Sequence, residues 1–145
     1  MTITDALIAE HRVFTDLFDH IEGVLPTLTT LAEVKLLAAL VGHLLQSHAD
    51  AEKNLAYVAL DHALKDKGPV ERLHQDHHEI DASLAQVRSA RRLPDACRLF
   101  KAAIAAGREH FQREEQSVFP LLEGMLERET LAALGAAHAR LTVES

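Results

Sequence analysis

The sequence predicts an all-α fold, an up-down-up-down antiparallel four-helix bundle completed by a short C-terminal helix. The 145 residues are 48% hydrophobic and 26% charged, a balance typical of one globular domain. Alanine and leucine prevail over β-branched residues, which favours helix over strand. Only 4 Pro and 6 Gly interrupt the chain. We therefore expect a single domain over residues 1–145, with the bundle at about 4–122 and a capping helix at about 127–141.

The first two helices begin at recognisable caps. Thr2 or Thr4 can cap a first helix, in which hydrophobic residues recur every three or four positions and which ends before Pro26. The segment from Thr30 to Glu33 has the capping-box form, in which each side chain binds the backbone amide of the other residue. A long second helix is expected from there to about residue 65.

Glycine and proline separate the remaining helices. Gly68 is suited to a left-handed cap that ends the second helix, and Pro69 to the first turn of a third helix that reaches about residue 90. Pro94 lies in the next break, and Pro120 is expected to end or kink the fourth helix that follows it. Because the connections are short, successive helices should be antiparallel neighbours.

Charge and cysteine content restrict the partners and the compartment. The formal net charge of -7, without a basic patch, disfavours binding to nucleic acid and to anionic membranes. No apolar stretch reaches the roughly 18 residues of a membrane span, and Asp5 and Glu10 lie where a signal peptide would be basic and then apolar. Cys97 is the single cysteine, so no intramolecular disulfide can form. We expect a cytoplasmic protein that is a monomer or a weak homodimer.

Two copies of one motif stand out on the second and fourth helices. His48 precedes Glu52 by four residues, and His110 precedes Glu114 by four. This spacing places an imidazole and a carboxylate on one face of a helix, about one turn apart. At roughly 100° per residue, each pair shares an arc with apolar residues and should face the core, the first pair beside Leu37, Leu44 and Leu55.

The first and third helices add further inward histidines. His11 lies in the middle of the apolar stripe of the first helix. On the third helix three histidines compete for the buried arc, of which His77 is best centred and His78 least buried. We select His74 and His77, with His78 as the substitute for His74. Glu115 is a candidate hydrogen-bond partner of a ligand histidine. Four further histidines are expected on the surface or behind the ligands: His20, His43, His62 and His138.

All these side chains fall at one level of the predicted bundle, where they need a partner. Five imidazoles and two carboxylates in a dry core would be costly without one, and a metal removes that cost. Seven ligands exceed the four that zinc takes, and calcium prefers oxygen, so the set predicts two transition-metal ions, with iron favoured by imidazole and bridging carboxylate. The predicted metal ligands are His11, His48, Glu52, His74, His77, His110 and Glu114.

With these motifs the chain resembles the hemerythrin family, in its HHE cation-binding branch, over about residues 4–122. The resemblance implies a non-haem di-iron centre with an oxo or hydroxo bridge, in which Glu52 and Glu114 bridge the two Fe ions. His74, His77 and His110 would hold one iron. His11 and His48 would hold the other, which keeps a vacant position for dioxygen or a related ligand such as nitric oxide or peroxide.

Two departures argue against reversible oxygen storage. The fourth helix has His-x-x-x-Glu where the oxygen-carrying hemerythrins have a longer spacing to aspartate, and the selected pair on the third helix is spaced by three. We predict a ligand-binding protein without a dedicated turnover reaction. The alternatives are a di-iron peroxidase or catalase, a module that senses iron or oxygen, and a metal-free helical bundle.

Overall fold

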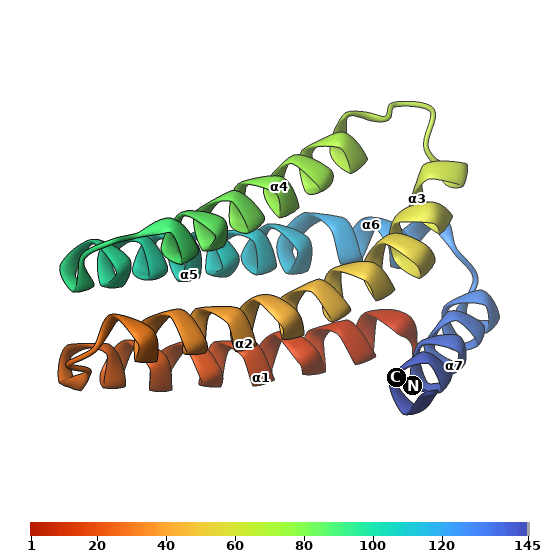
Figure 1. Ribbon diagram of the computed structural model, residues 1–145. Coiled ribbons are helices and arrows are strands. Elements are labelled where there is room, and N and C mark those ends of the chain that lie inside the picture. Colours follow the sequence, from red (N-terminus) through yellow and green to blue (C-terminus); the bar gives the residue numbers. More distant parts are fainter. Residues whose placement is uncertain (145) are drawn as a thin grey trace.

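The computed structural model describes residues 1–144, and within them the chain is all-helical, without a strand. Four long helices lie side by side (Figure 1). Helices α4 and α5 make the most extensive contact, and α2 packs on both of them. The long helices are α1 (Ile3–Val24), α2 (Leu31–Ala51), α4 (Gly68–Ser89) and α5 (Leu93–Arg113).

Capping boxes begin α1 and α2. The backbone amide of Asp5 donates to the Thr2 hydroxyl at 3.2 Å, so Thr2 rather than Thr4 caps α1. The amide of Glu33 donates to the Thr30 hydroxyl, also at 3.2 Å, which confirms the predicted second cap. After α1 the chain turns through a short 3₁₀ helix, Leu25–Thr27, that contains Pro26.

The second and fourth predicted helices each contain a π-helical turn that the sequence analysis did not anticipate. Helix α2 continues through the π-helical η2 (Glu52–Tyr57) into α3 (Val58–Ala63). Helix α5 continues through the π-helical η3 (Glu114–Val118) into α6 (Phe119–Met125). Pro120 therefore does not end the helix. Proline lacks the amide that would bind the carbonyl four residues earlier, and here that carbonyl, of Gln116, lies inside the π turn.

The expected left-handed cap at Gly68 is wrong. No glycine among the described residues has a positive φ, and Gly68 is the first residue of α4, with Pro69 in the first turn as predicted. The preceding helix ends earlier, at Ala63, because Leu64 adopts an extended conformation. The Gly68 amide donates to the Asp66 side chain at 3.0 Å, so an aspartate organises this connection.

Helix α7 (Arg128–Glu144) packs on α1 and crosses the end of the long helices at which both chain termini lie (Figure 1). It extends slightly beyond the predicted range of about 127–141. A Cβ at Gly135 would lie 2.3 Å from the Met1 carbonyl oxygen, so this glycine permits a close approach to the start of α1. No helix in the described part of the chain is long and apolar enough to cross a membrane.

The buried apolar residues form two clusters at different levels of the molecule. One contains Phe14, Phe18 and Phe100, and the other contains Ile3, Leu7 and Leu122. The buried face of α2 follows Val34, Ala38, Val41, Leu45 and His48. Leu44, expected beside His48 in the core, is instead 49% exposed. The buried face of α2 therefore passes through Leu45 rather than Leu44, and it still includes His48.

Candidate metal centre

Six of the seven predicted ligands meet in the space between the two apolar clusters. Each is buried, and together they come from every long helix or its continuation. The apolar stripes that bury the helices also draw these polar side chains inward, since they occupy the same faces. They are His11 on α1, His48 on α2, Glu52 at the start of η2, His77 on α4, His110 on α5 and Glu114 at the start of η3.

Both carboxylates occupy the first position of a π-helical turn. Glu52 begins η2 and Glu114 begins η3. In a π turn the hydrogen bond runs to the fifth residue rather than the fourth, which brings residue i+5 over residue i. Tyr57 is thereby brought over Glu52, and Phe119 over Glu114, where its ring stacks near that of His11 at 5.5 Å.

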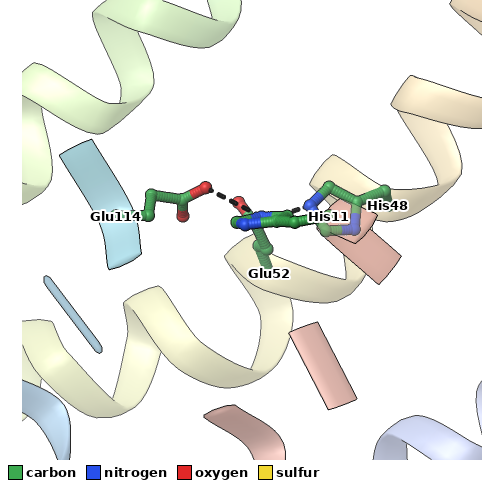
Figure 2. Close-up of side chains that lie close together, drawn as sticks. All are labelled: His11, His48, Glu52 and Glu114. Carbon is green, nitrogen blue, oxygen red and sulfur yellow. Dashed lines mark hydrogen bonds and ion pairs between the residues drawn. The ribbon is translucent and has the colours of Figure 1, made fainter. Parts of the chain in front are cut away.

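The first group of donors contains His11, His48, Glu52 and Glu114, whose ligand atoms all lie within 4.8 Å of one another (Figure 2). His48 Nε2 lies 2.5 Å from Glu52 Oε1. His11 Nε2 lies 3.4 Å from Glu52 Oε1 and 3.4 Å from Glu114 Oε1. Two imidazoles and two carboxylates therefore point at one small volume.

The second group contains His77, His110 and Glu52. The Nε2 atoms of the two histidines face each other at 2.9 Å. Glu52 Oε2 lies 3.4 Å from His77 Nε2 and 3.8 Å from His110 Nε2. Glu52 thus presents Oε1 to the first group and Oε2 to the second, which is the arrangement of a carboxylate that bridges two ions.

Tyr57 places a hydroxyl between the two groups. It lies 2.8 Å from Glu52 Oε2, 2.9 Å from Glu114 Oε2 and 3.4 Å from His77 Nε2. Its proton is donated to the carboxylates, which only accept when they are ionised. Burial, together with the charges of Glu52 and Glu114, raises the pKa of Tyr57 far above its ordinary value. The hydroxyl therefore stays protonated.

His74, the seventh predicted ligand, is not brought to either group. Its side chain is half-buried, and its ring meets the edge of the Tyr57 ring at 5.5 Å, so the tyrosine stands between it and the carboxylates. Burial lowers the pKa of His74, with Lys53 adding to the effect. His78, the substitute, is exposed. The Tyr57 hydroxyl, rather than a fifth imidazole, contacts the two carboxylates and His77.

Outer carboxylates orient two of the histidines. Glu10 Oε2 accepts a hydrogen bond from His48 Nδ1 at 2.5 Å, and Asp76 Oδ2 accepts one from His110 Nδ1 at 3.1 Å. Asp76 is also held by Arg113 and, at 3.2 Å, by Arg72. Such partners fix the ring orientation of a metal-binding histidine and leave its Nε2 atom for the metal.

Sequence reasoning missed both of these outer carboxylates and misplaced a third. Glu115, proposed for such a role, lies 4.0 Å from His11 Nδ1, and that nitrogen has no hydrogen-bond partner. Glu10 and Asp76 each directly precede a predicted ligand, a spacing that puts neighbours on different helix faces, so no periodicity marks them. His138, expected outside the ligand layer, is buried and binds Glu10 at 2.8 Å.

The protonation of the cluster shows how strongly its charges interact. Burial alone would lower the pKa of His48 and of His110, but the carboxylates around them raise each pKa to about 10. For His48 these are Glu52 and Glu10. Burial would raise the pKa of Glu52, but His48 and the other imidazoles hold it well below its usual value. The imidazolium charges of His48 and His110 thus offset the negative charges of the carboxylates around them.

The donor atoms fit a cation better than they fit one another. His48 Nε2 and Glu114 Oε1 are buried and have no hydrogen bond of acceptable geometry. Each nevertheless lies close to a possible ion-pair partner, His48 Nε2 at 2.5 Å from Glu52 Oε1 and Glu114 Oε1 at 3.0 Å from His110 Nε2. Their directions therefore converge on shared space rather than on each other. The chemistry of these donors suits a transition-metal ion.

A small cavity adjoins the cluster. Its volume is about 20 Å³, and its walls combine imidazoles and apolar side chains with Asp81. Roughly 10–15 Å³ of such volume accommodates one water molecule, so the space is about the size of one water. Phe111 closes one side, with its ring stacked on that of His11 at 4.1 Å. The lining residues are Leu45, His48, Ala49, His77, Ile80, Asp81, His110 and Phe111.

Comparison with known proteins gives one match. The family model described as the hemerythrin HHE cation binding domain matches residues 2–122. No curated protein and no solved structure matches the chain. The matched range includes every residue of the two donor groups and ends within α6, so α7 lies beyond it.

Proposed function

Since the chain belongs to the hemerythrin HHE cation-binding family, we propose that its buried cluster is a non-haem di-iron centre that binds dioxygen or a related small ligand. The single observation behind this proposal is the placement of Glu52, whose two oxygens face two separate groups of donors. A structural polar cluster has no need of such a divided carboxylate. Two adjacent metal ions do need one.

The ligand assignment follows the two donor groups. His11 and His48 would hold one iron and His77 and His110 the other, with Glu52 as the bridge between them. Glu114 belongs to the first group, and its Oε1 atom lies 3.0 Å from His110 Nε2, so it is the second candidate bridge. His74 is left out of the set. The Tyr57 hydroxyl stands in its place as a donor to both carboxylates.

The surroundings of the cluster favour a small uncharged ligand. When bound, two irons would supply redox chemistry and open coordination positions. The protein supplies apolar walls at Leu45, Ile80 and Phe111, and a space about the size of one water molecule. Phe14 adds a ring 5.3 Å from that of His48. These side chains limit both the size of the ligand and its contact with bulk water.

The order of the helices, the cellular compartment and the oligomeric state are part of the same proposal. We propose an antiparallel four-helix bundle in up-down-up-down order, which the short connections and the side-by-side long helices support (Figure 1). Metal-binding bundles commonly build their sites from side chains on facing helices. The free thiol of Cys97 supports a reducing compartment such as the cytoplasm, and we expect a monomer or a weak homodimer.

One observation favours a second candidate, a di-iron peroxidase or catalase. Such an enzyme needs an acid or base beside the open position, and Tyr57 places a hydroxyl inside the cluster. Its hydroxyl is engaged with Glu52 and Glu114, and Tyr57 is not among the residues that line the cavity, so it is poorly placed to exchange a proton with a ligand there. Ligand binding without turnover is therefore the preferred function.

The test is iron loading under anaerobic conditions, followed by absorption spectroscopy before and after exposure to air. We expect two irons per chain and a visible absorption band that appears when dioxygen is added. His48→Ala should lose the band and at least one of the two irons, whereas His43→Ala, which replaces an exposed histidine on the same helix, should keep the band and both irons. Catalytic consumption of added peroxide would support the second candidate. Absence of bound iron in the unaltered protein would refute both.

A further inference from the structure

Helix α7 contributes a buried histidine to the outer layer of the metal centre, although it lies outside the matched residues. His138 Nε2 lies 2.8 Å from Glu10 Oε1. The other carboxylate oxygen of Glu10 accepts the hydrogen bond from His48 Nδ1 at 2.5 Å. The three side chains form a continuous path from α7, through α1, to a predicted ligand on α2.

The chemistry of the path fixes which atoms carry hydrogen. An ionised carboxylate accepts hydrogen bonds and cannot donate them, so His138 Nε2 and His48 Nδ1 must both be protonated. A His48 ring with hydrogen on Nδ1 has its Nε2 lone pair free for a metal ion. Nε2 is the His48 atom that faces Glu52 in the donor group.

Glu10 needs a second partner to hold this position. Its side chain is 28% exposed and lines a surface cavity of about 260 Å³ together with His48 and His138. With one oxygen bound to His48 alone, the carboxylate could rotate towards the water in this cavity. The His138 contact holds the second oxygen and so fixes the plane of the carboxylate.

The position of His138 is in turn set by the docking of α7. Leu131, Gly135 and His138 follow one another at spacings of four and three, which places them on one face of the helix. Leu131 is buried, and the missing side chain of Gly135 lets α7 approach the backbone at Met1–Ile3. The docked helix therefore presents His138 to α1 at the level of Glu10.

We propose that His138 is a positioning residue for the metal centre, which acts through Glu10 to hold the His48 imidazole in its metal-binding orientation. This inference rests on the proposed function, because it assigns α7 a role in that same site. Replacing a hydrogen-bond partner behind a metal ligand typically lowers metal affinity about 10–100-fold. His138 acts through one further residue, so we expect about a 10-fold loss for His138→Ala and a larger loss for Glu10→Ala.

The experiment measures Co²⁺ binding to the full-length chain by competition with a chelator, and the ligand-field spectrum of the bound ion. His138→Ala should weaken binding about 10-fold and shift the spectrum. His138→Gln, which retains a side-chain N–H donor, should recover most of both. Leu134→Ala is the matched control, because Leu134 is a half-buried residue of α7 that packs on the apolar cluster around Leu7 and Leu122 and makes no hydrogen bond in the path. It should lower the melting temperature and leave affinity and spectrum near the wild-type values.

The outcomes separate this inference from the proposed function. Unaltered protein that binds no metal would overturn both. Unaltered protein that binds metal, with affinity and spectrum unchanged in His138→Ala, would overturn only the role of His138. An equal loss of affinity in Leu134→Ala and His138→Ala would show that α7 acts through general stability, and would also overturn the role of His138.

Discussion

Replacing Glu52 by glutamine should remove both metal ions, whereas replacing His77 should remove only one. Glu52 belongs to both donor groups and His77 to the second alone. Glutamine retains the volume of Glu52 and one acceptor oxygen, but it lacks the charge and turns an N–H donor towards imidazole nitrogen. His77→Ala leaves the four donors of the first group in place. We therefore expect metal contents of about two ions per chain for the wild type, one for His77→Ala and none for Glu52→Gln.

The same variants should differ in thermal stability by calculable amounts. An ion held at a free concentration of about 100 times its Kd stabilises the folded chain by about 2.7 kcal/mol. At roughly 3 °C per kcal/mol for a chain of this size, each ion should raise the melting temperature by about 8 °C. Loading should therefore raise it by about 16 °C in the wild type, about 8 °C in His77→Ala and not at all in Glu52→Gln.

The assay combines metal analysis by mass spectrometry with differential scanning fluorimetry, each with and without Fe²⁺ under anaerobic conditions. The exposed His43 serves as the control, since its replacement by alanine should reproduce the wild-type values. Metal-free melting curves of every variant report any loss of stability that is unrelated to the metal. Two ions per chain in Glu52→Gln would refute the reasoning, because the bridging position of Glu52 would then be unnecessary.

Three further predictions concern Tyr57, the titrating histidines and α7. Tyr57→Phe removes a buried donor from Glu52 and Glu114, so urea denaturation should show the metal-free chain to be less stable by about 1–3 kcal/mol; an unchanged midpoint would contradict the hydrogen bonds. The pKa values of His48 and His110 are raised to about 10, so the stability that they contribute is fully present below about pH 6.5 and is lost as pH rises through about 10. Metal-free melting temperatures should accordingly fall between pH 7 and pH 10, and a rise would contradict the ion pairs. Gly135→Ala should lower the melting temperature despite its better helix propensity, because its Cβ would meet the Met1 carbonyl at 2.3 Å, whereas Gly23→Ala, with open space around its Cβ, should not.

The helices and the six donors of the two groups could be predicted from the sequence, because both follow from the helical periodicity. Positions that repeat every three or four residues must share a face, whatever the details of packing. His11, His48 and His110 could therefore be placed in the core, and each is buried. The cap at Thr30 depends on residues three apart in sequence, so it could be predicted, whereas the first cap was left open between Thr2 and Thr4.

Tyr57 could not be placed because the sequence was interpreted with regular α-helical geometry. At 100° per residue, Tyr57 would lie about 140° around the helix from Glu52 and face away from the cluster. The π turn at Glu52–Tyr57 brings it back over Glu52, where its ring also excludes His74. The second π turn, Glu114–Val118, can be explained from the sequence, because Pro120 lacks the backbone amide that a regular α-helix would need there. No comparable proline follows Glu52, and we have no sequence-based reason for the turn there.

The outer partners of the cluster could not be predicted because they depend on packing between distant elements. His138 and Glu10 are separated by 128 residues, and their contact requires α7 to dock at the start of α1. Asp76 and His110 lie on different helices, α4 and α5. No pattern within one helix encodes either contact. Only the arrangement of the helices in space brings these groups together.

The most direct test of the central claim is X-ray diffraction from an iron-loaded crystal, with data collected on both sides of the iron absorption edge. The proposal predicts two anomalous peaks inside the molecule, one beside His11 and His48 and the other beside His77 and His110, with one oxygen of Glu52 bound to each. Peaks confined to the surface, a single buried peak, or a Glu52 carboxylate that contacts neither ion would contradict the di-iron assignment.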